Sequence, residues 1–247
     1  MQQYKRAVGG LPSTAMLESS ATCTSEERYP IMPPVRPRDA ASLVIHRKRN
    51  THYEVLMGRR GSKARFKPGV YVFPGGGLDR ADYRAQPAQS LAQELVPQLA
   101  VASSQRKADA LAMAAVREAH EEAGLMFGIP GSVGPVAHAT WRAFHRADVA
   151  PDLSALQFLG RAITPSHQPI RYHARFFSAP ADLFSGELAG DGELEDLRWI
   201  RIDDTAGLDM MEVQQLVLET LLQRLAGRAV PARRLFFNWG RRNVIDA

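Results

Sequence analysis

Short apolar runs divide the chain into strands on either side of a central helical region. Residues 41–47 form one such run, which predicts a buried strand, and residues 53–57 predict its hairpin partner across the polar segment 48–52. Further runs rich in β-branched and aromatic side chains predict strands at 70–73, 156–163, 171–178 and 196–200. We expect the strands at 156–163 and 171–178 to pair antiparallel, because only a short polar segment joins them.

Helical spacing occurs in three segments. Residues 111–125 contain strong helix formers and reach Gly124, the residue type that most often terminates a helix. Residues 210–225 are apolar at 210, 213, 217, 221 and 225, a stripe that predicts a helix packed on the core. Residues 90–102 also have helical spacing, but Pro97 interrupts it, so we expect one or two helices inserted on the surface. Residues 138–155 have a mixed pattern that predicts no element.

One face of the helix expected at 111–125 is acidic. On a helical projection Glu118, Glu121 and Glu122 fall within about 100° of one another, and the opposite side is apolar. Arg117 precedes Glu121 by one helical turn, a spacing at which the two side chains form an ion pair. Three carboxylates on one face repel each other, and Mg²⁺ or Mn²⁺ would relieve the repulsion through hard oxygen ligands. A solvated acidic face is the alternative that these residues alone leave open.

The composition is that of an ordinary globular protein. The chain has 247 residues, 45% hydrophobic and 23% charged, enough for one large domain or two small ones. No apolar run approaches the roughly 18–20 residues that cross a bilayer, and the first residues lack the apolar core of a signal peptide, so we expect no membrane association. The single cysteine, Cys23, excludes a disulfide or a cysteine metal site within one chain, which favours a cytoplasmic location.

The net charge of +5 suits an anionic ligand and is also compatible with loose attraction to nucleic acid. Much of the excess lies in short groups of Arg and Lys, one of them in the basic and aromatic tail at 231–247. We expect this tail to pack back over the domain; stacking on nucleic acid is the less favoured alternative. The sequence does not decide the oligomeric state, and a homodimer is compatible with it.

We expect one main domain. Residues 1–35 mix Ser, Thr, Pro and Gly without a period and are interpreted as a flexible extension. Residues 36–230 are expected to form the domain, with an insertion at about 78–108 and a C-terminal helix at about 210–226. No internal repeat and no second core is expected.

Residues 117–125, with the sequence REAHEEAGL, resemble the core of the Nudix box, R-E-U-x-E-E-x-G-U. The full box is G-x5-E-x7-R-E-U-x-E-E-x-G-U, and counting back from Arg117 places Asp109 where the family has Glu. Gly76 would be the leading glycine, which implies an insertion of about 27 residues inside the box. Ala119 stands at a position that a larger aliphatic residue usually occupies.

A second stretch resembles the coenzyme A diphosphatase branch of this family, whose pattern is L-L-T-x-R-S-x3-R-x3-G-x3-F-P-G-G-x2-D. Residues 56–79 keep its spacing, although Gly58 and Gly61 replace the Thr and the Ser. The arginines of the pattern are Arg60 and Arg65. Residues 163–177 are also similar to the insertion-bearing coenzyme A type, with His173 at a position where Asp is expected.

The resemblance implies an α/β Nudix fold, a mixed β-sheet sandwiched between helices, with a helical insertion. It also implies metal-dependent hydrolysis of a diphosphate linkage, with coenzyme A or acyl-coenzyme A as substrate and 3′,5′-ADP and (acyl-)4′-phosphopantetheine as products. Hydrolysis of another nucleoside diphosphate derivative (ADP-ribose, NADH or a sugar nucleotide) is the alternative within the enzyme class. A Nudix module that senses a nucleotide without cleaving it is the alternative outside that class, although such modules commonly lose box carboxylates.

The resemblance assigns roles to individual residues. Glu118, Glu121 and Glu122 would hold Mg²⁺ or Mn²⁺. The general base would be Glu118 or Glu193, and Arg117 would support it through its ion pair. The remaining assignments are substrate-binding residues: Arg60, Arg65, Gly75 and Gly76. The arginines would grip phosphate through paired hydrogen bonds, and the glycines would let the backbone turn sharply and approach the ligand. His120 falls on the apolar side of the helix and is expected to be structural.

Overall fold

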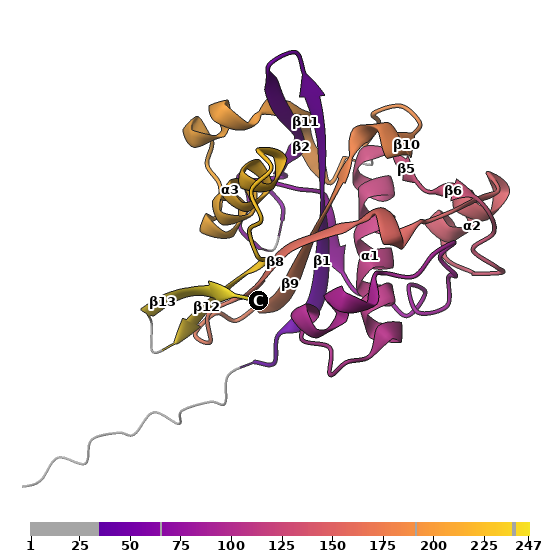
Figure 1. Cartoon of the computed structure of the whole chain (residues 1–247), viewed down its shortest axis with the longest axis horizontal. Coiled ribbons are helices and arrows are strands. Elements are labelled where there is room, and N and C mark those ends of the chain that lie inside the picture. The colour runs from indigo at the N-terminus through magenta and orange to yellow at the C-terminus, as the bar shows by residue number, and fades with distance from the viewer. Residues whose placement is uncertain (1–34, 65, 191, 239–240) are drawn as a thin grey trace, which may run out of the picture. The chain divides into compact units, whose positions relative to one another are not determined.

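The computed structural model describes residues 35–64, 66–190, 192–238 and 241–247 (Figure 1). All but the last residue of the expected N-terminal extension, and also Arg65, therefore lie outside the described residues. In the described part of the chain, no helix has the length and hydrophobicity needed to cross a membrane.

A nine-stranded mixed sheet forms the centre of the fold, in the order β11-β2-β1-β9-β8-β12-β13, with β3 paired to β2 and β4 to β1. Its strands are β1 (Arg38–Arg49), β2 (His52–Arg60), β3 (Tyr71–Val72), β4 (Gly75–Gly77), β8 (Gln157–Ile163), β9 (Tyr172–Pro180), β11 (Leu194–Arg201), β12 (Arg233–Asn238) and β13 (Arg241–Asp246). The pairs β1–β9 and β12–β8 are parallel, and the remaining pairs are antiparallel. The hairpin of β1 and β2 and the antiparallel pair of β8 and β9 confirm the strands predicted from the sequence.

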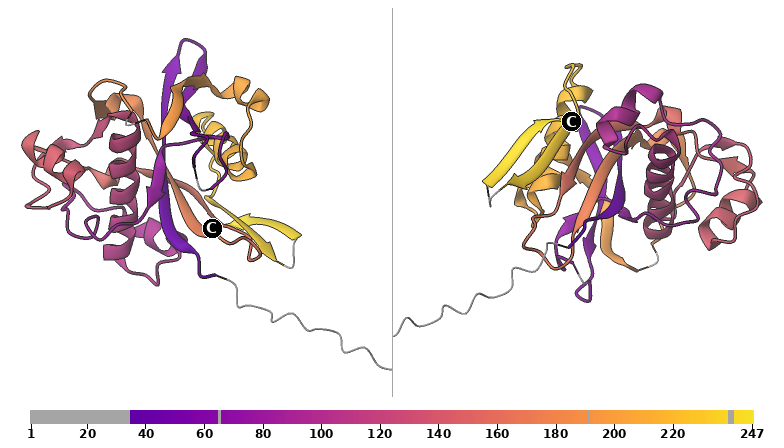
Figure 2. Two further views of the ribbon diagram at one scale, coloured as in Figure 1. Left: turned by 180° about the vertical axis from the view of Figure 1, so that it is seen from behind. Right: turned by 90° about the horizontal axis from the view of Figure 1, so that it is seen from below.

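Helices cover both faces of the sheet, as the α/β prediction requires (Figures 1 and 2). On one face lie α1 (Gln105–Ala123) and α2 (Ala139–Arg146), and on the other lies α3 (Glu212–Leu225). The remaining short elements are η1 (Gln93–Leu99), β5 (Met126–Phe127), β6 (Ile129–Pro130), β7 (Val149–Ala150), η2 (Leu153–Ala155), η3 (Ala181–Leu183), β10 (Phe184–Ser185) and η4 (Ile202–Gly207). Each face of the sheet has its own apolar cluster, one built on α1 and one on α3.

The helix α1 confirms the central prediction and starts earlier than expected. Ser104 caps it by accepting a hydrogen bond from the backbone N–H of Lys107, and Gly124 ends it in the left-handed conformation with φ 72°. The side that faces the sheet is rich in alanine, and Ala112, Ala115 and Ala119 are fully buried there. Such small side chains let the helix axis approach β1 and β4 closely.

The second helix, α3, covers the other face. Val217 and Leu221, two members of the predicted apolar stripe, are buried against Val44 of β1 and Phe176 of β9. The other stripe positions, Met210, Val213 and Leu225, pack at the edge of the same cluster.

The connection between β4 and α1 contains one 3₁₀ helix, η1, in place of the expected one or two surface helices. Pro97 lies inside η1, where it cannot donate the hydrogen bond that an α-helix requires at that position. Val96 and Leu99 of η1 are buried in the cluster around α1, so this segment completes the core instead of lying on its surface. The unassigned segment 138–155 contains α2, whose Trp141 and Phe144 are fully buried.

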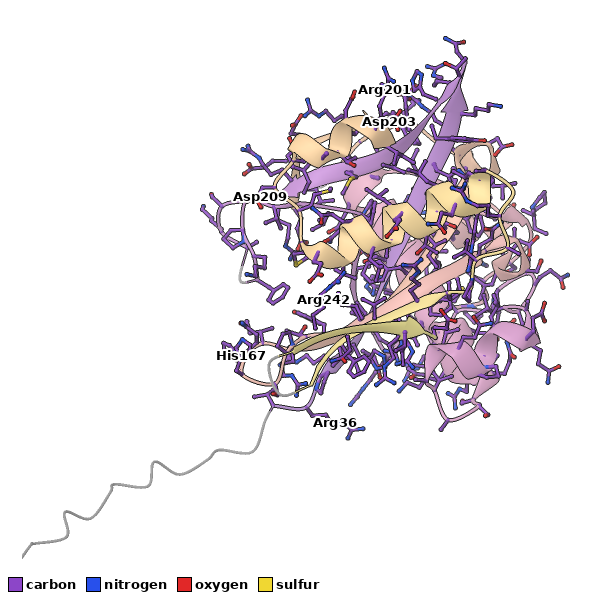
Figure 3. The ribbon with its side chains drawn as sticks, turned by 60° about the vertical axis from the view of Figure 1, so that its left-hand side comes forward. Arg36, His167, Arg201, Asp203, Asp209 and Arg242 are labelled. Carbon is purple, nitrogen blue, oxygen red and sulfur yellow. The ribbon has the colours of Figure 1, made fainter. Side chains whose placement is uncertain are left out.

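The tail at 231–247 extends the sheet. It forms the hairpin β12–β13, and β12 joins β8 in parallel through the register pairs Arg233↔Gly160, Arg234↔Arg161 and Leu235↔Ala162. The hairpin is also tied to α3, because Arg242, which is labelled in Figure 3, forms an ion pair with Glu212 at the first turn of that helix. A glycine is required where β12 meets β8, since a Cβ at Gly160 would stand 2.3 Å from the carbonyl oxygen of Arg233.

We therefore expect Gly160→Ala to separate β12 from β8 and to lower the free energy of unfolding by about 1–3 kcal/mol, the usual cost of overpacking. Urea unfolding measures the loss, and hydrogen exchange locates it in residues 233–246. The control is Gly207→Ala, because a Cβ at Gly207 would meet no atom within 4 Å. Unchanged exchange in the hairpin of Gly160→Ala would show that the β12–β8 pairing is not formed.

Candidate active site

A cavity of about 650 Å³ lies on the α3 face of the sheet, beside β4 and the acidic face of α1. It brings together most of the residues predicted from the sequence: Arg60, Gly75, Gly76, Glu118, Glu121 and Glu193. The backbone N–H of Gly75, which lines the cavity, donates to the carboxylate of Glu122 at 2.8 Å. Arg65 is outside the described residues. Both segments that resemble the coenzyme A branch contribute to the walls.

Arg117 organises the polar end of the cavity. The residue is only 5% exposed. Nη1 donates to Glu118 at 2.8 Å and to Glu121 at 3.0 Å, which confirms the ion pair predicted between Arg117 and Glu121. Nε donates to Asp82 at 2.9 Å, and Nη2 donates to the carbonyl oxygen of Gly77 at 2.7 Å. One buried cation therefore joins α1, β4 and the loop that follows β4.

The acid that partners Arg117 is Asp82, which the sequence analysis missed. Its carboxylate is buried and also accepts a hydrogen bond from Nε1 of Trp141 at 3.2 Å. Asp109, placed in the box by counting back from Arg117, instead accepts hydrogen bonds from the backbone N–H of Leu91 and from Gln105. Counting forward from Gly76 by the family spacing G-x5-E would have reached Asp82. The assignment of Asp109 is therefore corrected.

The glycines of β4 allow close approach, as expected, but they do not form a turn. They pair with β1 through Ala40↔Gly77, Ala41↔Gly76 and Ser42↔Gly75. A Cβ at Gly76 would stand 2.4 Å from Oε1 of Glu118, and one at Gly75 would stand 2.3 Å from Oγ of Ser42. These positions require glycine because there is no room for a side chain, and positive φ plays no part.

The carboxylates of the acidic face are crowded and poorly solvated. Burial raises the pKa of Glu118 to about 7, with Glu121 and Asp82 raising it further and Arg117 opposing the shift. Burial likewise raises the pKa of Glu122 to about 8, with contributions from Glu118 and Glu193, while the N–H of Gly75 opposes the shift. Such shifts in a concave site are typical of residues with a chemical function.

Two polar groups in the cavity wall lack a partner in the described structure. Nε of Arg60 and Oε1 of Gln214 are both buried and make no hydrogen bond. Gln214 belongs to α3 and is only 3% exposed. The sequence alone did not distinguish it from an ordinary polar residue on the surface of a helix. A buried polar atom without a partner costs free energy unless a ligand supplies the missing contact.

Two further side chains define the surroundings of the acidic face. The hydroxyl of Thr140 at the start of α2 donates to Glu121, a contact that no sequence pattern indicated. His120 packs edge-to-face on Phe144 with ring centroids 5.4 Å apart, away from the carboxylates, which confirms its structural role.

The donor chemistry of the acidic face fits a divalent cation, but the side chains are not gathered around one point. Among the described residues, no three His, Cys, Asp or Glu side chains converge at metal-ligand spacing. Glu121 is held by Thr140 and Arg117, and Glu122 is held by Gly75. Hard carboxylate oxygens are nevertheless the ligands that Mg²⁺ and Mn²⁺ prefer.

Comparisons with known proteins identify the family to which the chain belongs. The family model described as NUDIX domain matches residues 36–221. The chain is 29% identical to a crystallised NUDIX hydrolase from Alicyclobacillus acidocaldarius, with a TM-score of 0.59 over 75% of this chain and 90% of that one. The chain therefore belongs to the Nudix family, as its box indicated.

A curated relative is more distant. The chain is 26% identical over 175 residues to nudix hydrolase 7 of Caenorhabditis elegans, an alignment that covers 66% of this chain and 51% of the relative. The chain thus spans about half the length of the curated relative that it matches.

We expect Asp82→Asn to lower the free energy of unfolding by about 3–5 kcal/mol, because it removes one charge of a buried ion pair and leaves Arg117 undercompensated. Asp109→Asn is the matched control and should cost about 1 kcal/mol, since it changes hydrogen bonds to neutral donors. Urea unfolding of both variants measures the difference. A larger loss for Asp109→Asn would return the box position to Asp109.

The raised pKa values predict a pH dependence of stability in chelator-treated protein. Between about pH 4.3 and 8 the folded state binds more protons at Glu118 and Glu122 than the unfolded state does, so stability falls as the pH rises through this window. Glu122→Gln removes one of these groups. It should therefore retain a melting temperature roughly 5 °C or more above the wild type at pH 8.5, with the gap closing towards pH 5.

Thermal unfolding at several pH values measures this difference. Glu94→Gln, which alters an exposed carboxylate of η1, is the control and should follow the wild type. Parallel curves for the wild type and Glu122→Gln would contradict the assigned burial of Glu122.

Proposed function

We propose that this chain hydrolyses the diphosphate linkage of a nucleoside diphosphate derivative, with coenzyme A or acyl-coenzyme A as its substrate. The products are then 3′,5′-ADP and (acyl-)4′-phosphopantetheine. One observation carries the proposal. The two segments that resemble the coenzyme A branch, 56–79 and 163–177, both line the cavity that contains the box residues Glu118 and Glu121.

The cavity suits an elongated substrate with a charged centre. Its polar end combines the carboxylates with Arg60, whose unpartnered Nε would bind a phosphate oxygen. Its other walls are largely apolar and include Phe66, Ile163, Tyr172 and Val213. The volume of about 650 Å³ lies within the usual range for ligand sites.

The metal-binding residues in this proposal are Glu118, Glu121 and Glu122, which would hold Mg²⁺ or Mn²⁺. When bound, such an ion neutralises phosphate oxygens and lowers the pKa of a coordinated water. Arg117 fixes the positions of Glu118 and Glu121 and keeps the acidic face together. The N–H groups and absent side chains of Gly75 and Gly76 bring the backbone close to the substrate, and Arg65 remains a proposed phosphate contact.

The proton of the attacking water needs an acceptor, and Glu118 and Glu193 are the two candidates. Glu118 has a pKa near neutrality, which suits proton transfer at physiological pH. Glu193 enters the cavity from the segment before β11 and contributes to the electrostatic field at Glu122. Comparing the pH profiles of kcat for Glu118→Gln and Glu193→Gln distinguishes them.

The box insertion also belongs to this proposal. With Asp82 as the first acid, the family spacing to Arg117 is exceeded by about 27 residues. These residues contain η1, whose buried side chains complete the core next to α1. The insertion thus packs against the acidic helix, and its residues do not line the cavity.

The test is an assay of the full chain with Mg²⁺ or Mn²⁺ on coenzyme A, ADP-ribose, NADH and a sugar nucleotide. We expect the highest kcat/KM for coenzyme A, with 3′,5′-ADP as a product. Glu122→Gln should lower kcat by at least about 100-fold because it removes a metal ligand, whereas the exposed control Glu94→Gln should not.

Other outcomes separate the alternatives. A higher kcat/KM for ADP-ribose, NADH or the sugar nucleotide would reassign the substrate and keep the hydrolase. Tight binding of one of these molecules without turnover would indicate a nucleotide-sensing module, which the retention of all three box carboxylates argues against.

A further inference from the structure

Three arginines lie in one row across neighbouring strands of the sheet. Arg175 of β9 is in register with Arg161 of β8, and Arg161 is in register with Arg234 of β12. Side chains in register on adjacent strands lie on the same face of a sheet, and like charges directly opposite each other destabilise it. Such a row needs negative charge from another source.

The row faces away from the cavity of the proposed active site. A direct neighbour of each arginine in its strand lines that cavity: Ala174 before Arg175, Ala162 after Arg161 and Leu235 after Arg234. Because successive side chains of a strand point to opposite faces, the three arginines lie on the α1 side of the sheet.

Hydrogen bonds confirm this placement and fix two of the three side chains. Nε of Arg161 donates to the carbonyl oxygen of Gln98 at 3.0 Å, and Nε of Arg175 donates to that of Leu99 at 3.1 Å. Both carbonyls belong to η1. These contacts satisfy donors but add no negative charge.

The charge around the row is unbalanced. Asp39 is the one carboxylate paired with it in the described part of the chain, and Asp39 is shared between Arg175 and Lys107. His173 lies 3.4 Å from Nη1 of Arg161. Burial and the surrounding arginines lower the pKa of His173 to about 3, so its ring is neutral at physiological pH. The three arginines of the row and Lys107 thus share a single anion, Asp39.

Arg234 is the least satisfied member of the row. Its Nε is buried and has no hydrogen-bond partner in the described structure. Its guanidinium lies over the ring of Phe236, 4.4 Å from the ring centroid, a contact that holds the plane in place without using its donors. Arg161 and Arg234 are only half-buried, so an ion from solvent can reach them.

We infer that Arg161 and Arg234 form a second binding site, specific for a phosphate-type oxyanion and separate from the proposed active site. Their planar guanidinium groups match the paired oxygens of a tetrahedral anion. Arg175, almost fully buried behind them, adds charge without competing for the ligand. The bound anion would relieve the repulsion along the row and tie β12 to β8 and η1.

Titration of the full chain with inorganic phosphate tests this site, in chelator and at constant ionic strength set with chloride. We expect saturable binding by calorimetry and a phosphate-dependent rise in melting temperature. Arg234→Gln and Arg161→Gln should each weaken phosphate binding at least tenfold. Arg234→Gln should fold normally, because Nε of Arg234 has no hydrogen-bond partner in the described structure and loss of the charge reduces repulsion.

Two matched variants locate the binding. Arg233→Gln changes the neighbouring residue of β12, which pairs with Glu219, and should bind phosphate like the wild type. Arg60→Gln removes a cation of the active-site cavity and should also retain binding. Loss of binding in Arg60→Gln with retention in Arg234→Gln would assign the phosphate to the cavity and overturn the proposal, as would binding no stronger than that of chloride.

A second titration, with glycerol 2-phosphate, identifies the source of the anion. Equal affinity for both ligands would define a site for phosphate monoesters, and affinity for inorganic phosphate alone would define a site for the free ion. Each of these outcomes supports the site only if Arg234→Gln weakens the binding at least tenfold.

Discussion

The guanidinium of Arg117 connects the parts of the site that the chain supplies separately. It is buried, and its donors reach Asp82, the carbonyl oxygen of Gly77, Glu118 and Glu121. A buried cation tolerates such surroundings only if its donors are used, so the positions of β4, the following loop and α1 are set together. The acidic face could not exist in this buried form without it, because three neighbouring carboxylates would repel each other.

Close packing is the second condition for the site. The carboxylate of Glu118 occupies the space in which Gly76 would otherwise have a side chain. Ala119, at a position that commonly has a larger aliphatic residue in the family, is fully buried on the sheet-facing side of α1. Small residues on both partners thus bring the acidic helix against β4, and the low solvation that results raises the pKa of Glu118 and Glu122.

Local patterns in the sequence were sufficient for α1, α3, the strands β1, β2, β8, β9 and β11, and the acidic face. The helix formers before Gly124 predicted α1, and the one-turn spacing of Arg117 and Glu121 predicted their ion pair. Contacts between distant segments were not predictable in the same way. Asp82 lies 35 positions before Arg117, and choosing it over Asp109 required knowing where the inserted residues begin. Gln214 and Arg234 carry no local signal, because their importance depends on strands and helices that meet only in the fold.

The order of the segments along the chain has a consequence for how the site is completed during synthesis. Arg60 and the carboxylates of α1 belong to segments that are synthesised before β12, which contributes Leu235 to the cavity wall. A nascent chain that has emerged as far as α3 therefore holds the acidic helix and its partners but not the closing strand. Translation thus supplies the residues of the charged centre before the strand that closes the cavity.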